Sequence, residues 1–172
     1  MDHMTDNYDY KIIHFDSSIA KFTSSSNICD YYLSLIEPLR NVYKINIITS
    51  LINLPTNSPL NNSLEPIYID FNNYNRLITK NYIKNNDSSD NDIKFFDSII
   101  IENKTSITDN NVYKNDFNTS DSIFMLNPIE PQFNRINIRL FDKNNSLINK
   151  DQIIKFVMKI GIYYNNKKTT RI

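Results

Sequence analysis

The chain has 172 residues, a formal net charge of +0, 40% hydrophobic residues and 22% charged residues. This length suits one domain, with or without a tail, and the composition is typical of a folded protein rather than a disordered one. A net charge of zero excludes a global electrostatic field that would favour nucleic acid or an anionic membrane.

The first strand is predicted at residues 10–15, after a polar, flexible arm at residues 1–9. Residues 16–27 predict a loop that contains a brief extended piece at residues 20–22. Residues 28–40 fit two structures. A helix ended by a proline would place Cys29, Tyr32, Leu33 and Ile36 on one face, whereas a strand would place Tyr31, Leu33 and Leu35 on one face. We favour the strand, with a bend at Pro38.

Residues 41–54 give the clearest strand of the N-terminal half, because apolar and polar side chains alternate along them. A continuous alternation predicts one face made of Tyr43, Ile45, Ile47, Thr49 and Leu51, and an opposite face that includes Lys44, Asn46 and Ser50. We therefore expect this strand to lie with one side in the core.

The middle of the chain alternates between loops and short strands. Residues 55–66 contain three prolines and predict a long loop. Residues 67–71 alternate as a strand does, and the following pair, Asn72–Asn73, predicts a turn or a bulge. Residues 77–83 fit a strand continuation or a short helix, and residues 84–92 consist almost entirely of Asn, Asp and Ser, which predicts a solvent-exposed loop.

Residues 95–101 are apolar almost throughout, which predicts a strand covered on both faces. The polar stretch 102–118 contains one possible edge piece, at residues 112–113. A strand is predicted at residues 122–126. Residues 128–131 predict an extended link, because the proline at its end disfavours helical backbone in the residue before it.

Two strands with a strict period of two are predicted near the C-terminus, at residues 134–142 and 154–164. A polar turn at residues 142–146 joins them, and residues 165–172 form a basic polar tail. The predicted inner faces are Ile136, Ile138 and Leu140 in the first strand, and Ile154, Phe156, Met158, Ile160 and Ile162 in the second.

These elements predict an all-β fold, an antiparallel β-sandwich of the single jelly-roll type with about eight strands. No internal repeat indicates a propeller or solenoid, and the chain lacks the tryptophan and paired cysteines of an immunoglobulin core. The predicted organisation is a flexible arm at residues 1–9, one jelly-roll domain at residues 10–164 and a tail at residues 165–172.

Asn and Ile each make up about a sixth of the chain, whereas Gly161 is its only glycine. We therefore expect asparagine to supply most backbone positions with positive φ. Cys29 is the only cysteine, which excludes an intrachain disulfide and a cysteine-based zinc site and favours a small buried apolar role. The sequence predicts neither a signal peptide nor a membrane span.

Candidate catalytic groups are few. The only histidines are His3 and His14, and the second lies on a predicted strand, where a packed or surface role is expected. Four oxygen-bearing residues in one loop could hold calcium, but their spacing matches no EF-hand, so a solvated loop is favoured. These are Asp87, Asp90, Asn91 and Asp92. We predict no enzyme activity, no cofactor, and no catalytic, cofactor-binding or metal-ligating residue.

Two further groups could form surfaces. The C-terminal end is basic and contains Lys167, Lys168 and Arg171. We favour a solvated terminus over a tail that binds nucleic acid or a partner protein. Five tyrosines could form an exposed aromatic platform that binds a sugar or a protein, or they could form part of an oligomer interface. These are Tyr68, Tyr74, Tyr82, Tyr163 and Tyr164.

The C-terminal run Asn127-Pro-Ile-Glu-Pro-Gln-Phe-Asn-Arg-Ile-Asn-Ile-Arg-Leu-Phe-Asp-Lys-Asn-Asn-Ser-Leu-Ile148, followed by Phe156-Val-Met-Lys-Ile160, supports a family resemblance. It resembles the ends of single-jelly-roll capsid proteins of large eukaryotic double-stranded DNA viruses, virophages and polinton-like viruses. The resemblance covers about the last fifty residues; earlier strands match only in number and order. The chain lacks the doubled length of a major capsid protein with two jelly rolls.

The resemblance implies a structural capsid component, either a penton subunit or a minor capsid protein, located in the virion and assembled in the host cytoplasm. Its implied partners are further copies of itself, in a pentamer or trimer, and the major capsid protein, with no specific nucleic acid. The alternative from the residues alone is a carbohydrate-binding β-sandwich module that uses exposed tyrosines and the Asp/Asn loop.

Overall fold

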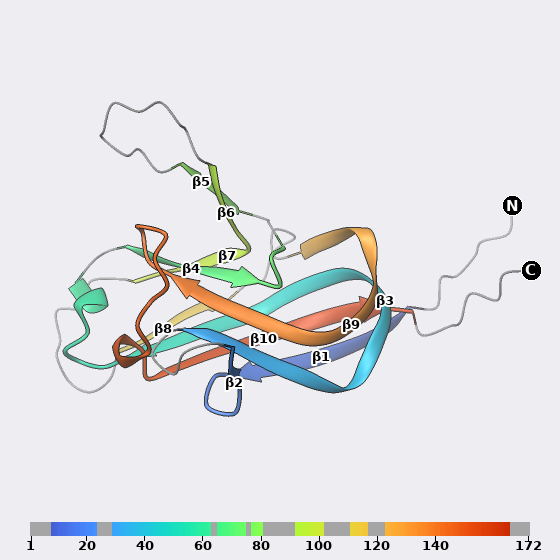
Figure 1. The fold of residues 1–172 in the computed structure, drawn as a ribbon, viewed down its shortest axis with the longest axis horizontal. Coiled ribbons are helices and arrows are strands. Elements are labelled where there is room, and N and C mark those ends of the chain that lie inside the picture. The colour runs from blue at the N-terminus through green and yellow to red at the C-terminus, as the bar shows by residue number, and fades with distance from the viewer. Residues whose placement is uncertain are drawn as a thin grey trace, which may run out of the picture.

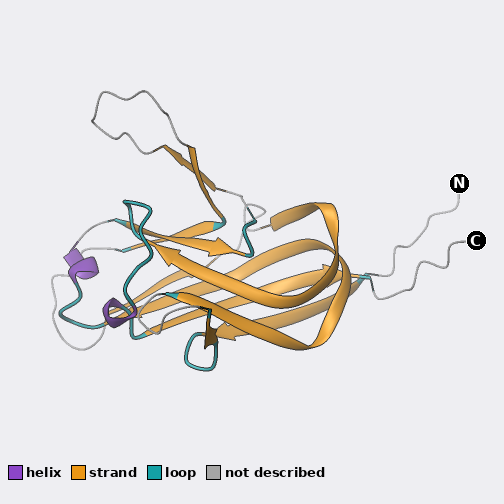
Figure 2. Cartoon of the chain, in the orientation of Figure 1, coloured by secondary structure: helices purple, strands orange, loops and turns teal. Residues whose placement is uncertain are grey.

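The computed structural model describes residues 8–23, 29–62, 65–74, 77–80, 92–101, 111–116 and 123–165, which are almost entirely strand (Figure 2). The strands are β1 (Asp9–Asp16), β2 (Lys21–Phe22), β3 (Asp30–Leu54), β4 (Pro66–Phe71), β5 (Leu77–Lys80), β6 (Asp92–Phe95), β7 (Asp97–Ile100), β8 (Asn111–Asp116), β9 (Ile123–Phe141) and β10 (Lys155–Tyr164). Two short 3₁₀ helices accompany them, η1 (Pro59–Asn62) and η3 (Lys150–Gln152).

Eight of the ten described strands form one antiparallel sheet that curls over into two layers (Figure 1). One layer has the order β1-β10-β3-β8, and the other has the order β3-β9-β4-β7, with β2 added beside β3. Two four-stranded layers in this order form a jelly roll, as the sequence predicts. The short β5-β6 pair forms a second sheet that stands away from the two layers (Figure 1).

Both long strands belong to both layers. β3 and β9 pair at Asp30–Arg139 in one layer and at Asn46–Ile123 in the other, with irregular register where the pair turns the corner. The predicted strands 28–40 and 41–54 are thus halves of one strand, and so are the predicted strands 122–126 and 134–142. The link at residues 128–131 is extended, as predicted, and is itself part of β9.

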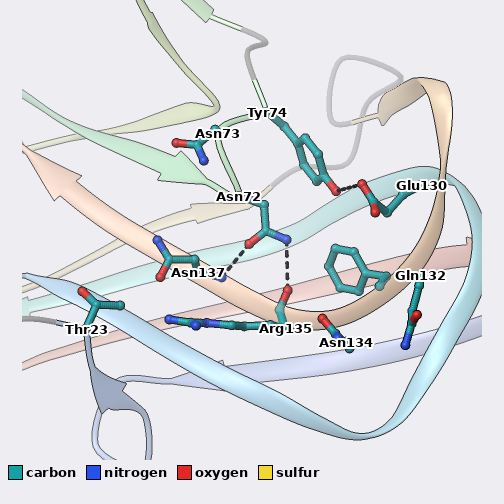
Figure 3. A pocket seen from close by; sticks show the side chains of 10 residues that line it. Thr23, Asn72, Asn73, Tyr74, Glu130, Gln132, Asn134, Arg135 and Asn137 are labelled. Atoms are coloured by element: carbon teal, nitrogen blue, oxygen red, sulfur yellow. Dashed lines mark hydrogen bonds between the residues drawn. The ribbon is translucent and has the colours of Figure 1, made fainter.

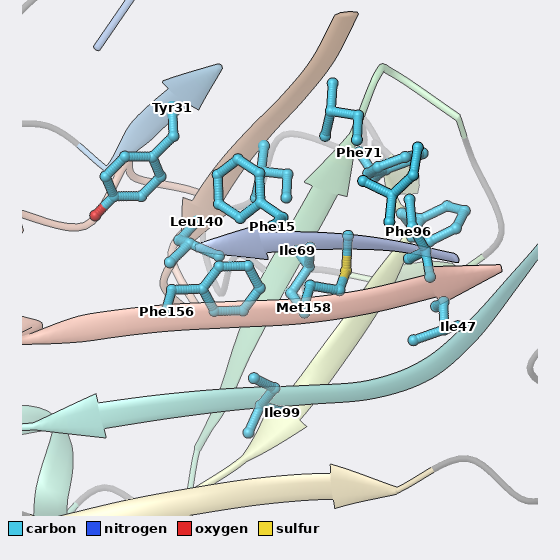
Figure 4. Packing of buried hydrophobic residues seen from close by; sticks show 14 of the residues in the cluster. Phe15, Tyr31, Ile47, Ile69, Phe71, Phe96, Ile99, Leu140, Phe156 and Met158 are labelled. Atoms are coloured by element: carbon cyan, nitrogen blue, oxygen red, sulfur yellow. The ribbon is translucent and has the colours of Figure 1, made fainter. Parts of the chain in front are cut away.

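The hydrophobic core fills the space between the layers (Figure 4). Side chains from the first layer, such as Phe15 and Phe156, meet side chains from the second; the rings of Phe15 and Tyr31 lie 6.2 Å apart across the interior. Ile136, Ile138 and Leu140 of β9 are fully buried, and so are four predicted inner residues of β10: Phe156, Met158, Ile160 and Ile162. The period of two therefore identified these inner faces correctly.

One predicted face is wrong. Ile45 and Ile47 point into the core, but beyond them the buried residues of β3 are Ser50, Ile52 and Leu54, not Thr49 and Leu51. The register against β10 shifts between residues 47 and 49 of β3, so Ile48 is an extra residue in a β-bulge. A bulge inverts the alternation of the residues that follow it. Tyr43 also does not point into the core, because the register between β3 and β9 is irregular between residues 42 and 44, where β3 passes from one layer to the other.

Two smaller predictions are also corrected. Residues 95–101 are not one strand covered on both faces: among the described strands β7 pairs only with β4, at the end of its layer, and Ile100 is 65% exposed. Ile154 precedes β10 and is half exposed, because the chain there follows η3 and it is Ile153 that packs inward. Residues 77–80 form a strand rather than a helix.

Asparagine occupies every described non-glycine position with positive φ, namely Asn41, Asn72, Asn73 and Asn145. This confirms the expectation drawn from the scarcity of glycine. Gly161 has another role: a Cβ at this position would clash with the hydroxyl and the ring of Tyr10, so the glycine lets that ring lie across β10.

The end of β1 is fastened to β10 by a carboxylate. Asp16 accepts a bond of 2.6 Å from the Ser18 hydroxyl, and its other oxygen lies 2.7 Å from the Lys155 ammonium. Burial by itself would raise the pKa of Asp16, but the bonds from Lys155 and Ser18 outweigh it and lower the pKa to about 2.

This pKa predicts acid sensitivity. A carboxylate with a lowered folded-state pKa stabilises the fold above its unfolded value, near 4, and loses that contribution as pH falls towards 2. We expect Asp16→Asn to be less stable than the wild type at pH 7, and its free energy of unfolding to change less between pH 4 and pH 2. Urea unfolding at a series of pH values measures both; parallel profiles in that window would contradict the assignment.

Candidate functional site

Most of the sequence-predicted chemical groups lie outside the described residues. His14 is exposed on β1, and Asp92 begins β6, whereas His3, Asp87, Asp90 and Asn91 lie outside the described residues, as does the basic end at residues 167–171. In the part of the chain that the structure describes, no group of three or more His, Cys, Asp or Glu residues could hold a metal ion. No helix of this part is long and apolar enough to span a membrane.

Cys29 is fully buried, as predicted, immediately before β3. The Tyr31 hydroxyl donates a hydrogen bond of 3.3 Å to its sulfur. Burial raises the pKa of the Cys29 thiol to about 11 despite this bond, so almost no thiolate is present at neutral pH.

We therefore expect Cys29 to be unreactive in the native protein. At pH 7.5 the Ellman reagent should modify it at least a hundredfold more slowly than the same chain in 6 M guanidinium chloride, because only the thiolate attacks and the sulfur is covered. Rapid modification of the folded protein would contradict this placement.

The tyrosines do not form one platform. Tyr68 and Tyr74 lie in and after β4, where Tyr68 stacks on Phe95 with ring centroids 4.6 Å apart, whereas Tyr163 and Tyr164 lie at the end of β10 in the other layer. Tyr82 lies outside the described residues. The structure instead groups Tyr163 with Tyr8, Tyr10 and Tyr43, in pairs 4.5–6.2 Å apart, and the Lys44 ammonium lies 3.8 Å above the Tyr163 ring. No sequence spacing predicts this cluster, because it depends on strand pairing.

A first hollow, the apolar groove, lies between β1 and the first half of β3 and has a volume of about 530 Å³. It is lined by Lys11, Ile12, Ile13, His14, Leu33, Ser34, Leu35, Ile36 and Glu37. Ile12 is 50% exposed and Ile36 is completely exposed. Both walls are unpaired sheet edges, because β1 pairs only with β10, and β3 beyond Tyr32 has no strand partner on this side among the described strands.

A second hollow, the amide groove, has a volume of about 500 Å³ and lies between β9 and the turn that follows β4 (Figure 3). Its lining is Thr23, Asn72, Asn73, Tyr74, Glu130, Gln132, Phe133, Asn134, Arg135 and Asn137. Asn72 spans the gap to β9: its amide nitrogen donates to the Arg135 carbonyl at 3.1 Å, and its amide oxygen accepts from the Asn137 backbone N–H at 2.6 Å. The sequence predicted the turn at Asn72–Asn73 but not the groove beside it.

A search of models of known protein families and a search of curated proteins both find no match for this chain. The fold and the two grooves therefore provide the basis for a functional proposal.

Proposed function

We propose that this protein is a non-enzymatic structural component of a viral capsid, a penton subunit or a minor capsid protein, that works by symmetric self-assembly and by contact with the major capsid protein. The observation that carries the proposal is the jelly-roll strand order, with two layers ordered β1-β10-β3-β8 and β3-β9-β4-β7. Fold alone does not determine function, so the surface must also fit the role.

The apolar groove supports self-assembly. Two sheet edges with unpaired backbone groups flank it, and such edges in natural proteins are usually covered or blunted. Ile12 and Ile36 expose large apolar surface there. The groove also carries a cation, Lys11, and an anion, Glu37, so one copy can present opposite charges to the next. We assign a second copy of this chain as the occupant of the apolar groove.

The mass of the assembly in solution tests the proposal. One chain weighs 20.3 kDa, and native mass spectrometry at micromolar concentration should detect assemblies of five or three chains. A protein that stays monomeric alone and also fails to assemble with co-expressed jelly-roll capsid proteins of the same genome would refute the proposed function.

A substitution tests the assigned surface. We expect Ile36→Asp to dissociate the ring into monomers that remain folded by circular dichroism, because this side chain is completely exposed in the single chain. Ile19→Asp, at another exposed isoleucine outside the groove, is the matched control and should leave the ring intact. A ring that survives Ile36→Asp would place the interface elsewhere.

A further inference from the structure

The amide groove has the chemistry of a binding site that capsid assembly does not require. Its lining includes five side-chain amides but only one cation and one anion, Arg135 and Glu130. Each amide presents two N–H donors and an acceptor oxygen close together. That combination matches neighbouring hydroxyl groups, each of which also donates and accepts.

The lining is held in place before any ligand binds. Asn72 is fixed to β9 by its two hydrogen bonds, and the Asn73 side-chain oxygen accepts from the Arg139 guanidinium at 2.7 Å. On the other wall, the Tyr74 hydroxyl donates to Glu130 at 3.3 Å. A site whose side chains are already ordered loses less conformational entropy on binding.

Other groups in the groove remain available to a ligand. The side chains of Gln132 and Asn134 are exposed and make no hydrogen bond within the described part of the chain. In Figure 3 the amides of Asn134 and Gln132 lie at the lower rim of the groove, below the Tyr74 ring. The half-buried Tyr74 ring supplies apolar surface to the lining, whereas Phe133 is only 2% exposed and belongs to the core.

The charges argue for a neutral ligand. The Arg135 guanidinium lies over the Tyr32 ring, 4.0 Å from its centroid, and Glu130 offsets its charge within the same lining. A phosphate or sulfate site would need an excess of cations, which this groove lacks. A metal site would need a cluster of ligands, and the described residues offer none.

We propose that the amide groove binds a neutral oligosaccharide, with Gln132 and Asn134 recognising hydroxyl groups and the Tyr74 ring contacting the apolar face of a sugar. The site differs from the aromatic platform and Asp/Asn loop expected from the sequence. Its volume is within the range of small-ligand pockets, about 300–1,000 Å³.

The test uses the full chain, isotope-labelled for NMR, titrated with maltotriose, mannotriose, N-acetyllactosamine and triacetylchitotriose. We expect at least one of them to shift the side-chain amide signals of Gln132 and Asn134 in the wild type. Gln132→Ala and Asn134→Ala should each weaken that binding by about five- to tenfold, as expected for one lost hydrogen bond. Asn144→Ala removes an exposed amide from a distant turn and should leave the affinity unchanged.

Sialyllactose and a sulfated heparin tetrasaccharide form the anionic arm of the test. Preference for these ligands, with loss of binding in Arg135→Ala and in 0.5 M NaCl, would overturn the assignment to a neutral ligand. Absence of groove shifts with all four neutral oligosaccharides would overturn the site itself, as would affinities that Gln132→Ala and Asn134→Ala leave unchanged. The wild-type shifts decide the question even if a variant folds poorly.

Discussion

Replacing Phe71 with alanine should cost about 3–5 kcal/mol of folding free energy, which is a large share of the about 5–15 kcal/mol that keeps a domain folded. Phe71 ends β4, is fully buried, and its ring lies 5.0 Å from that of Phe96 and 6.3 Å from that of Phe133. Loss of the ring leaves a cavity that three surrounding aromatic side chains cannot fill without leaving their own contacts. Equilibrium urea unfolding measures the change.

Phe22→Ala is the matched control. It removes the same atoms from a ring that is 37% exposed on the short strand β2, where it contacts Tyr31 and Lys150. We expect a loss of about 1 kcal/mol or less there, because little area returns to water. Equal losses in the two variants would mean that Phe71 does not lie between two layers, and the sandwich would then be wrong.

The sequence predicted the architecture because alternation survives wherever a strand is regular. In β10 every second residue from Phe156 to Ile162 is buried, and a period of two is sufficient to identify that face. The scarcity of glycine was equally informative, because asparagine is the abundant residue in this chain that takes left-handed positions at a small energetic cost. Both arguments depend on neighbours in the chain and not on tertiary contacts.

Features that depend on strand pairing were not predictable. The bulge at Ile48 inverts the face of the rest of β3, yet the apolar residues around it continue without a break in the sequence. The merging of two predicted strands into β9 is likewise a property of its pairing with β3. Both grooves lie between elements distant in the chain: one wall of the amide groove is the turn at residue 72 and the other is β9.

The alternating core pattern and the surface grooves support different functional conclusions. Alternation determines the fold, and the fold with its unpaired edges supports a role in assembly. Recognition of a ligand would depend on side chains such as Gln132 and Asn134, which contribute nothing to the core pattern. A sequence comparison guided by core pattern alone would therefore miss the amide groove.

Arg139→Met should destabilise the fold by about 2–3 kcal/mol. This is less than the cost of about 3–5 kcal/mol for breaking a fully buried ion pair, because the arginine side chain keeps 34% of its surface exposed. Asp70 and Arg139 face each other across β4 and β9, and the guanidinium Nε donates to the carboxylate at 2.7 Å. The Asp70 side chain is only 8% exposed, so methionine would leave a buried carboxylate without its cation. Urea unfolding of the variant measures the loss.

A double-mutant cycle separates that penalty from the value of the pair itself. Asp70→Asn alone should cost about 1 kcal/mol, since the amide oxygen can still accept from the Asn73 backbone N–H, and the two substitutions together should cost less than their sum. Strict additivity would mean that the ion pair is fully solvated in solution. Because Arg139 also holds the side chain of Asn73, Arg139→Met should weaken oligosaccharide binding in the amide groove, whereas Phe22→Ala should not.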